Sequence, residues 1–168
     1  MNMQTRRNHE ESGFTLIELL IVMSIILILA TLAIPAMQKT VKKANETSAI
    51  SSLRDLNAQE GTYSSTYPTH GFSCTLAAMG GKADAGAPTA EAAQLIPEDL
   101  ATGNKAGYMF AITNCTKVTV NNQDQYTGYQ ITAVPNTVGK TGDRGFCTDG
   151  NEIHYDPKGG TNCTELLQ

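Results

Sequence analysis

The sequence lacks the features of several functional classes. It has no large basic block and a formal net charge of -4, so it lacks the electrostatic footprint of a nucleic-acid-binding protein. It has no G-x-S-x-G, no H-E-x-x-H and no phosphate-binding loop, and its three histidines stand apart from one another. Its cysteines form no C-x-x-C pair of the kind used for zinc or thioredoxin-like chemistry. We therefore predict that the protein is not an enzyme and has no catalytic or metal-ligating residues.

Charge is also absent from Leu19 to Ile34, inside an apolar run from Phe14 to Pro35. As a helix this run would be about 33 Å long, close to the thickness of a bilayer core. It could be a cleaved secretory signal, a plain membrane anchor, or a membrane helix with a second purpose. The first is disfavoured, because the apolar region of such signals has about 7–15 residues and a small-residue cleavage site follows it. Here the small pair Ser12-Gly13 precedes the run.

Glu18 lies near the start of this apolar run. A carboxylate inside a membrane helix costs several kcal/mol unless it is paired or close to the interface, so it indicates a function by default. The alternative is that the side chain extends to the headgroup region, because it is near the helix start. Composition alone does not separate these two interpretations.

The stretch Gly13-Phe14-Thr15-Leu16-Ile17-Glu18, after a short polar segment, resembles the processing motif of type IV prepilins and type II secretion pseudopilins. In that family a membrane enzyme, prepilin peptidase, cuts after the glycine and methylates the new amino terminus. The resemblance implies a leader peptide at 1–13, cleavage after Gly13 and methylation of Phe14. Pro35 matches a proline that bends the same helix in the family.

The resemblance also implies a role for Glu18 in assembly. Its carboxylate would neutralise the cationic amine of Phe14 on a neighbouring subunit, while burial of the apolar helix supplies affinity. The implied partners are prepilin peptidase, copies of this chain or related pilins in a filament, an inner-membrane assembly platform and membrane lipid. The implied location is the bacterial inner membrane as a single-pass protein, with the soluble domain in the periplasm. Assembly would give a cell-surface filament or a periplasmic pseudopilus.

The region after the apolar run continues the helical pattern to about residue 60. Apolar or small residues recur mostly three or four apart, while Lys39, Lys43, Glu46, Arg54 and Asn57 occupy the opposite side. Lys39, Lys42 and Lys43 favour a solvated face, with anionic headgroups or neighbouring subunits as alternatives. Gly61 and Thr62 predict the helix end. The expected organisation is a leader at 1–13, a transmembrane and assembly helix at 14–35, an amphipathic continuation at 36–61 and a globular domain at 62–168.

Strand signals are concentrated late in the chain. Segments 108–113, 117–120 and 129–134 are rich in β-branched and aromatic residues, with turn residues at Asn121-Asn122 and Gly128. Asp149-Gly150-Asn151 predicts a hairpin between segments 144–148 and 152–155. The expected fold class is α+β: a long N-terminal helix, half membrane and half amphipathic, packed on a small antiparallel sheet in a pilin-like plan.

Four cysteines in a domain that the resemblance places outside the cytoplasm suggest two disulfides, with four free buried thiols as the alternative. Of the three pairings, we favour Cys74–Cys115 with Cys147–Cys163, because the second closes a short loop around the predicted hairpin. Many type IV pilins have a C-terminal loop bounded by a disulfide, so the pattern leans toward pilins.

Four acidic residues occur close together near the C-terminus: Asp143, Asp149, Glu152 and Asp156. Some pseudopilins bind calcium in a comparable loop, and neighbouring oxygen ligands suit that ion. The spacing does not match an EF-hand, and hairpin turns use aspartate and asparagine in any case. Turn formation is therefore our preferred interpretation, with no cofactor expected and calcium as the alternative.

Three functions remain to be weighed. The leading one is a structural subunit of a type IV pilus-like filament, and the close alternative is a pseudopilin of a type II secretion system. The third is an anchored periplasmic binding domain that never polymerises. The Gly13-Phe14 junction and Glu18 argue against the third, because a plain anchor requires neither.

Overall fold

The computed structural model describes residues 13–82 and 86–167. The chain divides into two compact units, Met1–Met37 and Gln38–Gln168, and one helix, α1, contributes to both. The elements in chain order are α1 (Leu16–Thr66), α2 (Leu76–Met79), α3 (Glu98–Ala101), β1 (Asn104–Lys105), β2 (Tyr108–Val120), β3 (Gln123–Pro135), β4 (Gly145–Thr148), β5 (Ile153–Asp156) and β6 (Glu165–Leu166).

In the first unit, the described structure is the apolar part of α1. The large apolar side chains from Leu16 to Leu29 are each at least 51% exposed. Within the described ranges α1 is the one helix that is long and apolar enough to cross a membrane, and its most apolar window has a mean hydropathy of 2.8. None of the residues in this window is buried by the part of the chain that the structure describes.

The second unit is built on a six-stranded sheet in the order β1-β2-β3-β4-β5-β6, with every neighbouring pair antiparallel. The longest pair, β2 and β3, is joined at Asn121 and Asn122, whose positive φ values of 51° and 65° fit a tight hairpin turn. The hairpin predicted at Asp149-Gly150-Asn151 joins β4 to β5. Gly128 is not a turn residue, because it lies inside β3 and pairs with Thr116 of β2. The register of the two strands is irregular on either side of Thr116.

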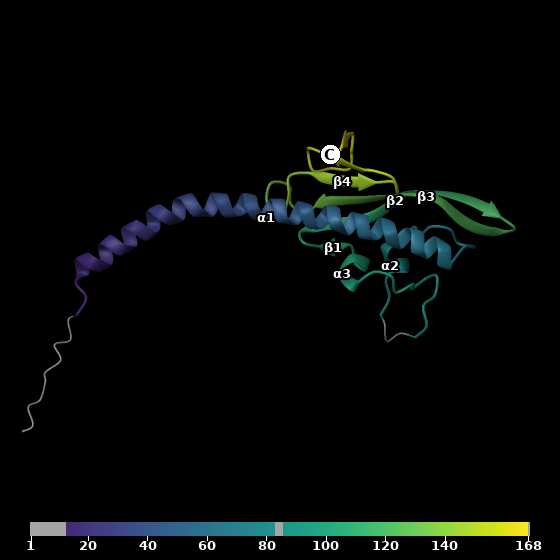
Figure 1. The fold of residues 1–168 in the computed structure, drawn as a ribbon, viewed down its shortest axis with the longest axis horizontal. Coiled ribbons are helices and arrows are strands. Elements are labelled where there is room, and N and C mark those ends of the chain that lie inside the picture. Colours follow the sequence, from purple (N-terminus) through teal and green to yellow (C-terminus); the bar gives the residue numbers. More distant parts are fainter. Residues whose placement is uncertain (1–12, 83–85, 168) are drawn as a thin grey trace, which may run out of the picture. The chain divides into compact units, whose positions relative to one another are not determined.

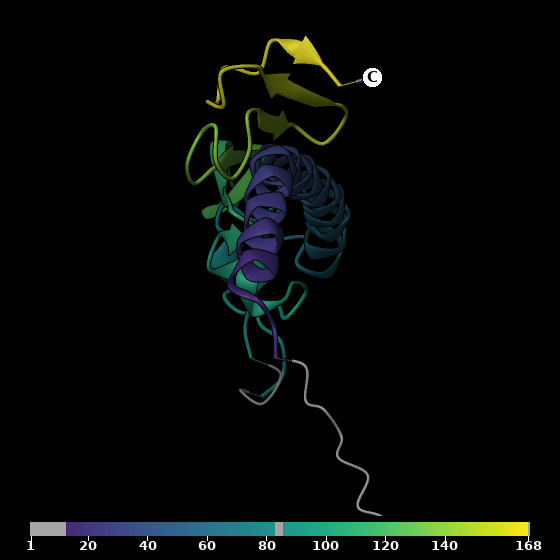
Figure 2. The ribbon, with the colours of Figure 1, turned by 90° about the vertical axis from the view of Figure 1, so that its left-hand side faces the viewer.

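The second half of α1 packs against this sheet, which confirms the α+β class. Ala49, Leu53 and Leu56 of α1 belong to one buried cluster with Ile131 of β3 and Phe146 of β4. The C-terminal strands β4 to β6 lie to one side of this part of α1, while α2 and α3 lie to the opposite side (Figures 1 and 2). This part of α1 thus lies between the short helices and the C-terminal strands (Figures 1 and 2).

The helix continues to Thr66, five residues beyond the end predicted at Gly61. Three hydroxyls in this last stretch donate to backbone carbonyls four residues earlier, those of Thr62, Ser65 and Thr66. Tyr63 is only 3% exposed, and its hydroxyl donates to the carbonyl of Ala90 at 2.7 Å. Tertiary packing therefore outweighs the low helix propensity of glycine, and the helix ends near Pro68, which disfavours a helical residue before it.

Candidate functional site

The helix start contains the residues that the prepilin resemblance singles out. Thr15 immediately precedes the first helical residue, and Glu18 lies in the first turn. Glu18 Oε2 accepts hydrogen bonds from the Thr15 backbone nitrogen at 2.9 Å and from Thr15 Oγ1 at 2.8 Å. The Glu18 nitrogen donates back to Thr15 Oγ1 at 3.3 Å. This reciprocal pattern is a capping box, which satisfies backbone donors that an uncapped helix leaves free.

The capping box gives Glu18 a local role that our sequence analysis missed, although the T-x-x-E spacing was visible. Both bonds that Glu18 accepts from the described residues end on one oxygen, Oε2. A carboxylate accepts through two oxygens, so the cap is compatible with a second donor on Oε1. The predicted pairing with a neighbouring amine therefore stays a prediction.

The junction between Gly13 and Phe14 is open. Phe14 is 82% exposed, and apart from the chain neighbours of Gly13 no atom of the described residues lies within 4 Å of the position that a Cβ on Gly13 would occupy. An exposed peptide bond of this kind suits access by a peptidase. Further along, α1 is helical through position 35, and the bend predicted at Pro35 stays a prediction.

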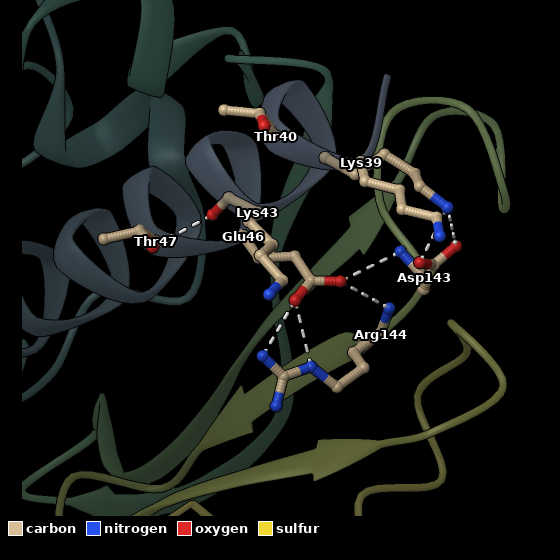
Figure 3. A pocket seen from close by; sticks show the side chains of 8 residues that line it. Lys39, Thr40, Lys43, Glu46, Thr47, Asp143 and Arg144 are labelled. Atoms are coloured by element: carbon tan, nitrogen blue, oxygen red, sulfur yellow. Dashed lines mark hydrogen bonds and ion pairs between the residues drawn. The ribbon is translucent and has the colours of Figure 1, made fainter. Parts of the chain in front are cut away.

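In the second unit, Glu46 of α1 binds the segment before β4 (Figure 3). Its Oε2 accepts from Arg144 Nε at 3.0 Å and Nη2 at 2.8 Å, and its Oε1 accepts from the backbone nitrogens of Asp143 and Arg144. The Arg144 guanidinium also lies over the rings of Phe146 and Tyr155, 5.4 and 5.2 Å from their centroids. We call this arrangement the Glu46–Arg144 clamp.

The burial of Glu46 differs from the prediction that it lies on the polar face of α1. Glu46 was expected on the solvent side, yet it is only 7% exposed. Its burial is tolerated because each oxygen accepts two hydrogen bonds, two of them from a cation. No periodicity signal could have identified it, since its partner lies 98 residues away in the sequence.

A second acidic residue of α1, Glu60, is also directed into the fold. It is completely buried, and its Oε2 accepts from the Ser73 backbone nitrogen at 2.8 Å. Its Oε1 has no hydrogen-bond partner among the described residues. Burial raises the pKa of this carboxyl to about 7, and the bond from Ser73 offsets only part of that effect.

The four cysteines form two disulfides, Cys74–Cys115 and Cys147–Cys163, the pairing favoured from the sequence. The first ties the chain just before α2 to the middle of β2. The second ties β4 to the segment before β6 and encloses the β4–β5 hairpin. The two bonds thus fasten different parts of the globular unit.

The C-terminal carboxylates are used separately. Asp149 accepts from the nitrogen of Asn151, as in an Asx turn, and Asp156 accepts from the nitrogens of Lys158 and Asn162. Asp143 pairs with Lys42 at 2.8 Å. The described ranges contain no group of three or more His, Cys, Asp or Glu side chains that could hold a metal ion. The arrangement matches the use of aspartate in turns.

The histidines stand apart from these groups. His154 lies 3.9 Å from Glu152 at the surface, while His70 contacts Thr69 and the ring of Tyr67. His9 lies outside the described residues. Within the part of the chain that the structure describes, the two histidines therefore lie in separate places, each beside surface residues.

Comparison with known proteins identifies a family motif in the first part of the chain. The family model of the prokaryotic N-terminal methylation motif matches residues 8–34, which include the Gly13-Phe14 junction, the capping box and most of the apolar run. No curated protein and no solved structure matches the chain significantly. The chain carries the prepilin-type signal of type IV pilins and pseudopilins, and this motif supports its assignment as a pilin-like protein of one of those two kinds.

Proposed function

We propose that this protein is a non-enzymatic structural subunit of a type IV pilus-like filament. Prepilin peptidase cuts it after Gly13 and methylates Phe14, and α1 then assembles with other pilin subunits. The observation that carries the proposal is the position of Glu18. It lies at the start of an apolar run that is otherwise uncharged and has exposed side chains, inside a matched methylation motif. An apolar surface of this extent requires lipid before assembly and neighbouring helices after it.

Location and partners follow from the same reasoning. The chain is inserted once in the bacterial inner membrane, with its globular unit in the periplasm, until the inner-membrane assembly platform adds it to a filament. The two disulfides support an oxidising compartment for the globular unit. The carboxylates near the C-terminus form turns, and no cofactor is part of the proposal.

A pseudopilin of a type II secretion system is the second candidate, because the methylation motif is common to both kinds of protein. The Cys147–Cys163 bond closes a C-terminal loop of the kind that many type IV pilins have, and this favours the pilus. Filaments of this subunit in the fraction sheared from the cell surface would support the pilus. Their absence, with the subunit confined to the envelope, would support the pseudopilus.

The role of Glu18 is tested by two variants that separate capping from pairing between subunits. Glu18→Ala removes the carboxylate and the two capping bonds that it accepts, while the backbone nitrogen of residue 18 can still donate to Thr15 Oγ1, and we expect a stable membrane protein that does not assemble. Thr15→Ala removes the two capping bonds of the Thr15 hydroxyl but keeps the carboxylate and its bond from the backbone nitrogen of residue 15, and we expect assembly close to wild type. Normal filament yield from Glu18→Ala would contradict the proposed pairing, and failure of both variants would assign the defect to the cap.

Processing is tested by the intact mass of the unreduced protein extracted from its native membrane. We expect a chain that begins at Phe14, heavier by one methyl group and lighter by four hydrogens. A mass that retains residues 1–13 would mean that the motif is not used. The anchored domain that never polymerises would then be the better explanation.

A further inference from the structure

We propose that Lys39 and Lys43 of α1 form a binding site for the phosphate of an anionic phospholipid headgroup. They line an open hollow of about 640 Å³ between α1 and the segment before β4 (Figure 3). The inference rests on the proposed membrane anchoring and adds a specific lipid contact to it. We call this surface the basic hollow, and its charged residues are Lys39, Lys42, Lys43, Glu46, Asp143 and Arg144.

The basic hollow has more positive than negative charge. Four of its six charged residues are cations, in a chain with a formal net charge of -4. Glu46 accepts its four hydrogen bonds from Arg144 and the adjacent backbone, while Asp143 binds Lys42 with both oxygens at 2.8 and 2.9 Å. Both carboxylates are therefore occupied by other partners. Two positive charges, those of Lys39 and Lys43, remain uncompensated.

Lys39 and Lys43 both line the basic hollow, where the Lys39 side chain extends toward Asp143 and that of Lys43 toward Glu46 (Figure 3). Both are exposed, and neither makes an ion pair within 4.0 Å among the residues that the structure describes. They are four residues apart on α1, which places them on the same helix face. The residues of the Glu46–Arg144 clamp and of the Lys42–Asp143 pair also line the hollow. The sequence alone favoured a solvated face for these lysines. It did not show that the carboxylates of Glu46 and Asp143 are bound to other residues and so leave the two lysine charges uncompensated.

Chain length brings a headgroup within reach, however the two units are arranged. Lys39 is four residues beyond Pro35, so even a fully extended chain would separate them by only about 14 Å. The headgroup region on each side of a bilayer is roughly 5–8 Å thick, and lysine side chains extend toward it. Basic residues next to a membrane span attract anionic lipids. A lipid phosphate is therefore the nearest abundant anion for these two lysines.

The test uses the full chain in phosphatidylcholine nanodiscs that contain a trace of spin-labelled phosphatidylglycerol or spin-labelled phosphatidylcholine. Electron paramagnetic resonance gives the fraction of each lipid immobilised on the protein, and hence the preference for the anionic lipid. We expect Lys39→Gln/Lys43→Gln to lower that preference on the order of fivefold. Added salt should reduce the preference of the wild type more than that of the variant.

Lys82→Gln/Lys158→Gln is the matched control, because it removes two exposed positive charges outside the basic hollow. We expect it to keep the wild-type preference. Arg6 and Arg7 are present in the wild type and in both double variants. The quantity to compare is therefore the difference in anionic-lipid preference between each variant and the wild type. An equal preference in the wild type and in Lys39→Gln/Lys43→Gln, or an equal loss in the control, would overturn the site.

Two other outcomes separate this inference from the proposed function. Failure of the wild type to insert into phosphatidylcholine nanodiscs would contradict the membrane anchoring itself. An unchanged lipid preference together with lost filament assembly in Lys39→Gln/Lys43→Gln would mean that the hollow faces carboxylates of a neighbouring subunit. That result would overturn the lipid assignment while leaving the filament proposal standing.

Discussion

Arg144 Nη2 lies 2.8 Å from Glu46 Oε2, and this contact joins the middle of α1 to the start of β4. The Glu46 side chain is 9% exposed and that of Arg144 is 36% exposed, so the pair is only partly screened by solvent. Removing one member of a buried pair leaves the other charge without its partner, which is costlier than the loss of the attraction alone. The clamp therefore adds a polar attachment to the apolar packing that holds α1 on the sheet.

We predict that Glu46→Ala lowers the free energy of unfolding of the globular unit by about 3 kcal/mol. Four donors, including the Arg144 guanidinium, would lose their acceptor. Urea unfolding of the full chain in detergent, followed by near-ultraviolet circular dichroism, measures the change. Glu152→Ala is the control, because the Glu152 side chain is 65% exposed and its contact with His154 is long at 3.9 Å. Equal effects of the two substitutions would contradict the role of the clamp.

The two disulfides should stabilise the fold unequally. Cys74–Cys115 closes a loop with a sequence separation of 41, and Cys147–Cys163 one with a separation of 16. In the chain-entropy model these bonds contribute about 4 and about 3 kcal/mol respectively. The longer loop contributes more because its closure removes more conformational freedom from the unfolded chain.

The comparison uses two variants in which reduction breaks a single bond. Cys147→Ala/Cys163→Ala retains only Cys74–Cys115, while Cys74→Ala/Cys115→Ala retains only Cys147–Cys163. We expect dithiothreitol to shift the urea midpoint further in the first variant. Because each protein is compared with itself, packing changes from the alanines cancel. A larger shift in the second variant would show that native contacts, rather than loop length, set the contributions.

Local patterns in the sequence predicted most of the fold. The apolar run, the enrichment of segments 108–113 and 129–134 in β-branched and aromatic residues, and the two hairpin turns each depend on neighbouring residues, and these elements are present in the structure. The end of α1 was misplaced because Tyr63 contacts the carbonyl of Ala90, far along the chain. Packing of this kind overrides the local signal of Gly61.

The candidate site divides in the same way. The Gly13-Phe14 junction and Glu18 are contiguous in sequence, so a motif reveals them. The burial of Glu46 depends on Arg144, 98 residues later, and that of Glu60 on the loop at Ser73. Acidic residues at helical spacing are most simply assigned to the solvent face, and only tertiary contacts show that these two are buried.

Glu60 is expected to make stability depend on pH. The carboxyl is fully buried, and within the part of the chain that the structure describes one of its oxygens has no hydrogen-bond partner, so its charged form is poorly solvated. Tyr63 of α1 and Tyr129 of β3 are the titratable groups influenced by it, and burial followed by the charge of Glu60 raises the pKa of Tyr129 to about 12. Both tyrosines are neutral near pH 7, so they do not compensate a negative charge.

We predict that the Glu60→Gln variant is more stable than the wild type above pH 7 and has little advantage below pH 4.5. The folded-state pKa of about 7 lies above the ordinary 4.5, so the folded protein binds the extra proton between these values. The stabilising contribution of this group is therefore complete below pH 4.5 and is lost as the pH rises to 7. The loss amounts to roughly 3 kcal/mol at most. Urea midpoints at pH 5 and pH 8 measure it, with exposed Glu165→Gln as the control. An identical pH dependence in the wild type and Glu60→Gln would exclude this group as the cause.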